Sequence, residues 1–201
     1  MKPIVALTSR PFSLPSAPSR LLLGVAALLL LLAGQMSTAL PVRADTVITT
    51  VSVGTQPDAV AVNSVTNKIY VANYGNDSVT VIDGATNATN IVHVGGQPDA
   101  VAVNSVTNKI YVANYYDGTV TVIDGATNAT STVNVGTLPR DVAVNSVTNK
   151  IYVANWYSSS VTVIDGATNA TTTVSVLNFN AYGDAYAVAV NSVTNKIYVA
   201  N

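Results

Sequence analysis

The side chains able to do chemistry in this chain are few in kind. It has no cysteine, a single histidine (His93), and ten acidic residues that are all aspartate. Without cysteine it can form no disulfide, no thiolate metal site and no cysteine nucleophile. One imidazole cannot build a multi-histidine copper or iron centre. Any paired-carboxylate site for acid–base chemistry must therefore consist of two aspartates.

Three of the aspartates occupy one repeated position. Asp83, Asp124 and Asp165 each begin a copy of the segment DGATNAT. A catalytic site needs different groups that converge on one point, whereas these identical groups lie one repeat apart. The segment also supplies a single carboxylate, which is too few for a calcium loop. We therefore interpret the three residues as turn formers.

His93 stands where the later repeats have Asn134 and Ser175, on an outer strand of its unit. A position that accepts Asn and Ser is typical of a solvated edge rather than of a ligand set. No unique polar cluster stands out elsewhere in the sequence. The sequence thus predicts no catalytic residue, no metal site and no bound cofactor.

The charge distribution argues against a nucleic-acid partner. The formal net charge is −1, but four of the nine basic residues lie in the first 44 positions. Residues 45–201 keep four lysines and Arg140 against all ten aspartates. A phosphate-binding surface needs an excess of basic groups, so we expect no binding to nucleic acid.

The first 44 residues have the organisation of a secretory signal peptide. A basic stretch precedes thirteen uninterrupted apolar residues at 21–33, and a more polar segment ends in Val42-Arg43-Ala44. This order is typical of a signal cleaved before Asp45. A transmembrane helix needs about 20 apolar residues, although an uncleaved anchor is the alternative. We expect an exported protein, periplasmic, cell-surface or secreted, with no membrane span after signal removal.

Internal repeats indicate the architecture. The segment AVNSVTNKIYVAN occurs four times and VTVIDGATNAT three times, with a period of 41 residues between the first units. The first unit contains four short runs rich in Val, Ile, Thr and Tyr, at 59–63, 68–73, 78–83 and 89–94. Repeats of about 40–45 residues with this content are typical of propeller blades. We predict an all-β protein, a β-propeller of four-stranded antiparallel blades.

The segments VTNKIYVAN and VTVIDGATNAT, with a Gly-x-x-Pro stretch between units, resemble the YVTN-repeat β-propeller family over residues 54–201. The resemblance implies blades of four strands, usually seven to a ring, in exported or cell-surface proteins. It implies little about a reaction, because propellers serve both as enzymes and as binding platforms.

On this basis the chain divides into a signal peptide (1–44), an N-terminal closing strand (45–53), three blade repeats (54–94, 95–135 and 136–176) and a partial blade repeat (177–201). That is a partial ring of about three and a half blades, against the seven that the resemblance implies. Two interpretations stay open: the product of a truncated gene, or a building block of which two copies pair as a homodimer that completes a ring. Either one leaves a blade face and strand edges exposed.

Variation among the units is confined to two sets of connections. Residues 63–67 and 83–87 recur unchanged in the later units, whereas 74–77 and 95–99 differ from their counterparts. In a four-stranded blade the two variable connections emerge together, on what we call the variable-loop face. The unchanged connections form the invariant-turn face. Because loops carry binding while the scaffold positions them, we predict recognition at the variable-loop face.

The variable-loop face is aromatic and mildly acidic, which suits a protein or glycan partner. Its candidate recognition residues are Tyr116, Trp156, Tyr157, Phe179, Tyr182 and Arg140. Tyr74, Tyr115 and Trp156 share one repeated position, so we also expect these three to wedge between blades.

Three classes of function remain. We favour an exported, non-enzymatic scaffold for binding or cell-surface interaction. The second class is a fragment of a propeller enzyme, lactonase-like or a cofactor-dependent oxidoreductase, with its site in further blades. The third is a purely structural surface-layer component whose loops have no dedicated ligand.

Overall fold

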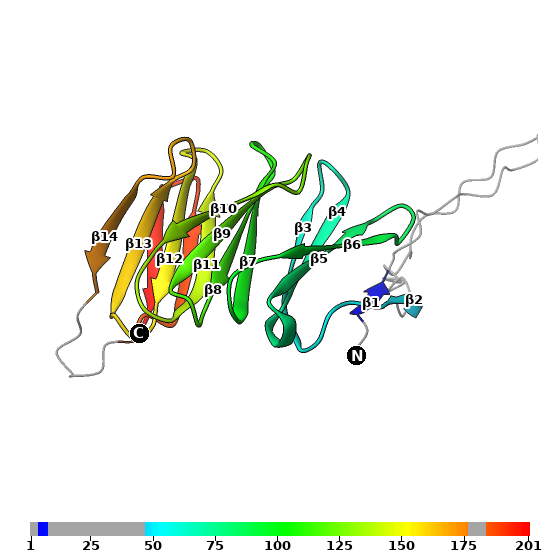
Figure 1. Cartoon of the computed structure of the whole chain (residues 1–201). Coiled ribbons are helices and arrows are strands. Elements are labelled where there is room, and N and C mark those ends of the chain that lie inside the picture. The colour runs from blue at the N-terminus through cyan, green and yellow to red at the C-terminus, as the bar shows by residue number, and fades with distance from the viewer. Residues whose placement is uncertain (1–3, 8–46, 177–183) are drawn as a thin grey trace, which may run out of the picture. The chain divides into compact units, whose positions relative to one another are not determined.

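The computed structural model describes residues 4–7, 47–176 and 184–201 (Figure 1). Three four-stranded antiparallel sheets follow one another along the chain, and in each the strands pair in sequence order. Blade 1 consists of β3 (Pro57–Asn63), β4 (Lys68–Asn73), β5 (Ser78–Asp83) and β6 (Thr89–His93), with a short 3-10 helix, η1 (Tyr74–Asn76), between β4 and β5. Blade 2 consists of β7 (Pro98–Asn104), β8 (Lys109–Asn114), β9 (Thr119–Asp124) and β10 (Thr130–Asn134). Blade 3 consists of β11 (Pro139–Asn145), β12 (Lys150–Asn155), β13 (Ser160–Asp165) and β14 (Thr171–Ser175), and the two-stranded blade 4 of β15 (Ala187–Asn191) and β16 (Lys196–Ala200).

The strands lie where the repeat pattern predicts them, with one systematic difference. β3 begins at Pro57 rather than at residue 59, and its register against β4 shifts between Pro57 and Ala59. The same shift recurs at the start of β7 and of β11. A β-bulge of this kind leaves a residue unpaired and re-aims its side chain. The bulged residues are Asp58, Asp99 and Arg140.

The repeated turns form through local side-chain hydrogen bonds. The Asp83 carboxylate accepts from the main-chain N–H groups of Ala85 at 3.0 Å and Thr86 at 2.9 Å, and also from the Thr86 hydroxyl. Asn87 then takes a positive φ of 60°, which asparagine tolerates better than most residues. Because the same bonds recur around Asp124 and Asp165, the prediction that these aspartates form turns is confirmed.

Apolar side chains between neighbouring blades form the core. Tyr70 and Val79 of blade 1 pack against Ile110 and Val112 of blade 2, and an equivalent cluster joins blades 2 and 3 around Tyr111. The side chains of Tyr70 and Tyr111 are wholly buried. Each blade therefore depends on its neighbours for burial, as expected for a repeat fold.

The N-terminal part departs from expectation in its strand pairing. β2 (Val47–Val51) pairs with β1 (Ile4–Leu7), a strand that the sequence pattern does not predict, and not with a blade. In blades 1 to 3 the fourth strand pairs with the third strand of the same blade. Blade 4, as described, contains only β15 and β16 and has no third strand with which a closing strand could pair. The rest of the predicted signal peptide lies outside the described residues. Within the described ranges, no helix is long and apolar enough to cross a membrane.

Candidate functional site

The invariant-turn face joins the blades through repeated hydrogen bonds. The Asn63 side-chain amide donates to Asn108 Oδ1 of blade 2 at 2.9 Å. The Lys68 ammonium donates to the main-chain oxygen of Gly125, also in blade 2, at 2.8 Å. Both bonds recur one repeat later between blades 2 and 3. At these two junctions the repeated residues therefore join one blade to the next.

Two cavities near this face also repeat. They have volumes of about 230 and 200 Å³. The first is lined in part by Lys68 and Asp83, and the second by their counterparts Lys109 and Asp124. Because a repeated lining creates no convergent set of different groups, we regard both cavities as a consequence of blade packing.

The variable connections on the opposite face are hydrogen-bonded to one another. The main-chain N–H of Tyr74 donates to the oxygen of Gln56 at 2.9 Å, and that of Gly75 to the oxygen of Thr55 at 3.0 Å. Analogous bonds hold Tyr115 and Trp156 in blades 2 and 3. The two sets of loops therefore lie on one face, as predicted.

Arg140 is the centre of an aromatic cluster on the variable-loop face. Its guanidinium carbon lies 5.7 Å from the ring centroid of Tyr115, 5.5 Å from that of Trp156 and 4.6 Å from that of Tyr186. The rings of Tyr115 and Trp156 stack with their centroids 6.4 Å apart. Arg140 Nε also lies 3.4 Å from Asp99 Oδ2. Cation–π contacts within about 6 Å are attractive, so this basic side chain is held from several sides.

A pair of carboxyl groups lies beside Arg140. The side chain of Asp99 is only 10 % exposed. Burial and a side-chain hydrogen bond with Asp58 raise the pKa of Asp99 to about 6, against the opposing charge of Arg140. Within the part of the chain that the structure describes, no further His or Asp completes a metal site here. A carboxyl group that titrates near neutral pH is a candidate for binding or for acid–base chemistry.

The expectation that the chain holds no unique polar cluster is therefore wrong. Asp58, Asp99, Arg140 and Tyr186 occupy the same position of successive units. Identical groups at such a position would be spread around a ring, but here two aspartates are followed by an arginine and a tyrosine. Each first strand contacts the next, β3 with β7, β7 with β11 and β11 with β15, and the bulge at the start of β3, β7 and β11 brings these side chains together. An alignment of the four units, position by position, identifies Tyr186 as a member of the cluster around Arg140.

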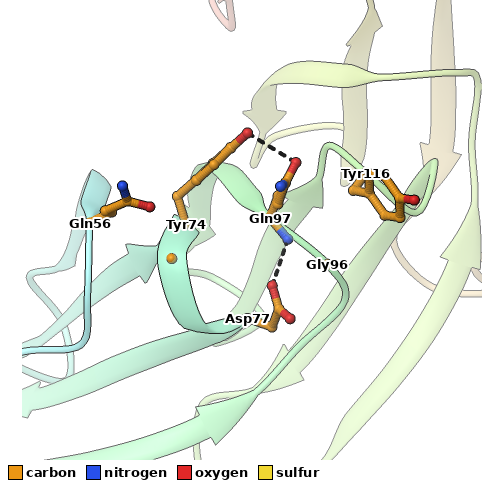
Figure 2. A pocket seen from close by; sticks show the side chains of 7 residues that line it. Gln56, Tyr74, Asp77, Gly96, Gln97 and Tyr116 are labelled. Carbon is orange, nitrogen blue, oxygen red and sulfur yellow. Dashed lines mark hydrogen bonds between the residues drawn. The ribbon is translucent and has the colours of Figure 1, made fainter.

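A pocket of about 330 Å³ opens between blades 1 and 2 on the same face. Its lining residues are Gln56, Tyr74, Gly75, Asp77, Gly96, Gln97 and Tyr116. Figure 2 shows Gln97 between the rings of Tyr74 and Tyr116. The Tyr74 hydroxyl donates to Gln97 Oε1 at 2.9 Å, and the main-chain N–H of Gln97 donates to Asp77 Oδ1 at 2.8 Å. Aromatic rings, an amide and a carboxylate thus line one space.

The polar lining of this pocket is specific to its junction. Between blades 2 and 3, Leu138 stands where Gln97 stands and Gly118 where Asp77 stands. The next junction therefore lacks counterparts of the Gln97 amide and of the Asp77 carboxylate. A search for charged and aromatic residues overlooks Gln97, although its replacement by leucine in the next unit is a readable signal.

The predicted recognition residues fall into three groups. Tyr116 and Tyr157 are 71 % and 72 % exposed. Trp156 is half-buried in the cluster around Arg140, as expected of a residue wedged between blades. Phe179 and Tyr182 lie outside the described residues.

Successive four-stranded antiparallel sheets, packed through their first strands, define an unclosed β-propeller. No protein-family model and no curated protein sequence matches the chain. Its fold is similar to that of several solved structures, which support the assignment to the propeller class.

The hydrazine synthase of Kuenenia stuttgartiensis matches with a TM-score of 0.66 and 19 % identity, over 74 % of this chain and 43 % of that one. A streptogramin B lyase matches with a TM-score of 0.62 and 8 % identity, over 73 % and 48 %. An auxiliary nutrient binding protein from Bacteroides thetaiotaomicron matches with a TM-score of 0.59 and 12 % identity, over 73 % of this chain and 36 % of that one. The chain spans less than half the length of each, and identities this low establish the fold alone. Because these proteins include both enzymes and a binding protein, the fold does not select a function.

Proposed function

We propose that this chain is an exported, non-enzymatic β-propeller of the YVTN-repeat type that binds glycans through its variable-loop face. The observation that carries the proposal is the pocket between blades 1 and 2, where Tyr74 and Tyr116 flank Gln97 and Asp77. The invariant turns of the same blades are engaged in bonds between blades, which leaves recognition to the loops.

The pocket lining suits a sugar ring. A sugar has an apolar C–H face and a rim of hydroxyl groups, and a tyrosine ring is a flat amphipathic surface that can cover that face. Gln97 accepts from Tyr74 through Oε1, so its Nε2 is available to donate to a hydroxyl group. Asp77 adds carboxylate acceptors at the same place, and the exposed ring of Tyr116 borders them.

Binding to a glycan array and to whole cells tests this proposal. We expect the wild-type protein to bind, and a Tyr116→Ala/Tyr157→Ala variant to lose about tenfold in affinity, equivalent to about 1.4 kcal/mol. The matched control is Val106→Ala/Val147→Ala. These valines are 75 % and 76 % exposed at turns of the invariant-turn face, and their loss should leave binding unchanged.

Each other outcome has a distinct meaning. Absence of wild-type binding, or equal binding by the tyrosine variant, contradicts the proposal and favours a purely structural surface-layer component. Binding to cells that survives enzymatic removal of their glycans, yet is lost in the tyrosine variant, identifies a protein partner instead.

Export is supported by the leader-like sequence of residues 1–44. N-terminal sequencing of the protein from an extracytoplasmic fraction should give Asp45 as the first residue. A chain that keeps its leader and stays with the membrane would indicate the anchor, and a chain found only in the cytoplasm would contradict export.

One observation favours a second function. Asp58 and Asp99 share a hydrogen bond and the pKa of Asp99 is raised to about 6, which is the range of a general acid or base. A lactone-hydrolysing activity of this pair would be lost in Asp99→Asn and kept in Tyr116→Ala/Tyr157→Ala. Absence of turnover of a lactone panel by the wild-type protein would remove this alternative.

A further inference from the structure

The two end blades expose apolar surfaces that are buried at the junctions inside the chain. On blade 1, Val60 and Val62 are 58 % and 60 % exposed, whereas Val142, the counterpart of Val60 in blade 3, is 6 % exposed. On blade 4, Tyr198 is 58 % exposed, whereas its counterpart Tyr111 is wholly buried. Blade 1 thus exposes the surface that packs against the preceding blade at an internal junction, and blade 4 exposes the surface that packs against the following blade.

The hydrogen-bonding groups of the two ends are complementary as well. At each internal junction a buried asparagine at the end of a first strand donates to an asparagine of the next blade at 2.9 Å. Asn191 is the corresponding donor of blade 4, and Asn67 is the corresponding acceptor of blade 1. Both are exposed, and within the described residues neither the Asn191 amide N–H groups nor Asn67 Oδ1 has a partner.

The lysines repeat this arrangement. Lys68 and Lys109 each reach a glycine oxygen in the turn between the third and fourth strands of the next blade. Lys150 bonds instead to Asp165 of its own blade at 2.6 Å, because blade 4 as described offers no such turn. Lys196 of blade 4 is the exposed donor in this series, and the oxygen of Gly84 in blade 1 is the acceptor that matches it.

The uncovered part of the blade 1 surface also matches blade 4 in size. Val51 and Val53 pack against Val71 and Ile82, in the way that outer-strand valines pack between blades 1 and 2. They already cover the outer part of the blade 1 surface, and the inner strand β3 remains exposed. Blade 4 consists of the two inner strands, β15 and β16, which are the ones that this uncovered part would accommodate.

We infer that blade 4 of one copy of this chain packs head to tail on blade 1 of a second copy, in the geometry of the internal junctions. The occupant is a second copy because every donor, acceptor and apolar side chain at the two ends belongs to an interface that the chain builds three times within itself. Two such contacts join a pair of copies into a ring to which each contributes four blades, within the range of about 4–8 blades seen in propellers.

Light scattering coupled to size-exclusion chromatography tests the inference, on protein purified from cells that express residues 1–201. We expect twice the mass of a single chain. Val62→Asp and Tyr198→Lys should each weaken the pairing at least about tenfold, because each buries an unpaired charge, and yield single chains at micromolar concentration. In a variant with both substitutions, the aspartate introduced at position 62 of one copy faces the lysine introduced at position 198 of the other. These opposite charges should restore the pair.

Val147→Asp is the matched control, since Val147 is 76 % exposed and lies in a turn outside the proposed contact. It should keep the double mass, and a strand-rich circular dichroism spectrum should show that all variants are folded. A wild-type protein that is monomeric or polydisperse overturns the inference. So does a Val62→Asp variant that keeps the double mass.

Discussion

The invariant-turn face and the variable-loop face of the propeller are built at opposite ends of the same strands, yet their side chains have different roles. On the invariant-turn face, Asn104 is wholly buried and joins blade 2 to blade 3. On the variable-loop face, Tyr116 is 71 % exposed and borders a pocket with a polar lining of its own. Identity among the units thus marks groups that hold blades to each other. Difference marks the surface available for recognition.

The largest expected contrast is between two tyrosines of blade 2. Tyr111→Ala removes a wholly buried ring from the core and should cost about 3–5 kcal/mol, as for other buried aromatic residues. Tyr116→Ala removes an exposed ring and should stay within about 0.5 kcal/mol. Urea unfolding followed by circular dichroism measures both. Similar losses would contradict the assignment of Tyr116 to a recognition surface.

A smaller contrast separates two asparagines at one repeat position. Asn104→Ala deletes the amide that donates to Asn149 and the oxygen that accepts from Val106 and Thr107. Loss of these part-buried hydrogen bonds of the wholly buried Asn104 side chain should cost about 1–3 kcal/mol. Asn191→Ala at the exposed end of blade 4 should cost less than half of that in the same urea unfolding experiment, done below the concentration at which copies associate. Equal costs would mean that the contact between blades contributes nothing.

The smallest expected effects concern pH, where the two faces should respond with opposite sign. Hydrogen bonds from Thr127 and Ala126 hold the pKa of Asp124 below its ordinary value of 3.8, whereas burial raises that of Asp99 to about 6. A lowered carboxyl pKa stabilises the fold above pH 3.8, and this contribution is lost as the pH falls. A raised one contributes stability below pH 3.8 that is lost as the pH rises through about 6.

Unfolding free energies measured between about pH 3 and pH 7 separate these contributions. Asp99→Asn should flatten the decline that accompanies a rise from about pH 4 to about pH 6, and Asp124→Asn the decline below about pH 4. Asp58→Ala removes the hydrogen bond that helps to raise the pKa of Asp99, so it should move the upper transition to lower pH. An upper transition that persists in Asp99→Asn would contradict the role given to this carboxyl.

Sequence reasoning locates the blade strands well because the repeats show each strand several times with the same turn residues around it. β4, for example, spans the predicted residues 68–73. The cluster around Arg140 is harder to predict because it depends on a β-bulge that breaks the alternation of inward and outward side chains. The pairing of β2 was not predictable from the repeats either, since its partner β1 lies outside them.

The division of labour between the faces is tested most directly by measuring stability and glycan-array binding for Gln97→Leu and Asn104→Ala side by side. Leucine fits the backbone at residue 97, because Leu138 adopts a φ of 52° at the equivalent position and Gln97 one of 54°. We expect Gln97→Leu to lose binding while its stability changes by no more than about 1 kcal/mol. Asn104→Ala should lose stability and, where it is folded, keep wild-type binding. If both variants lose binding in proportion to their stability, the two faces do not have separate roles.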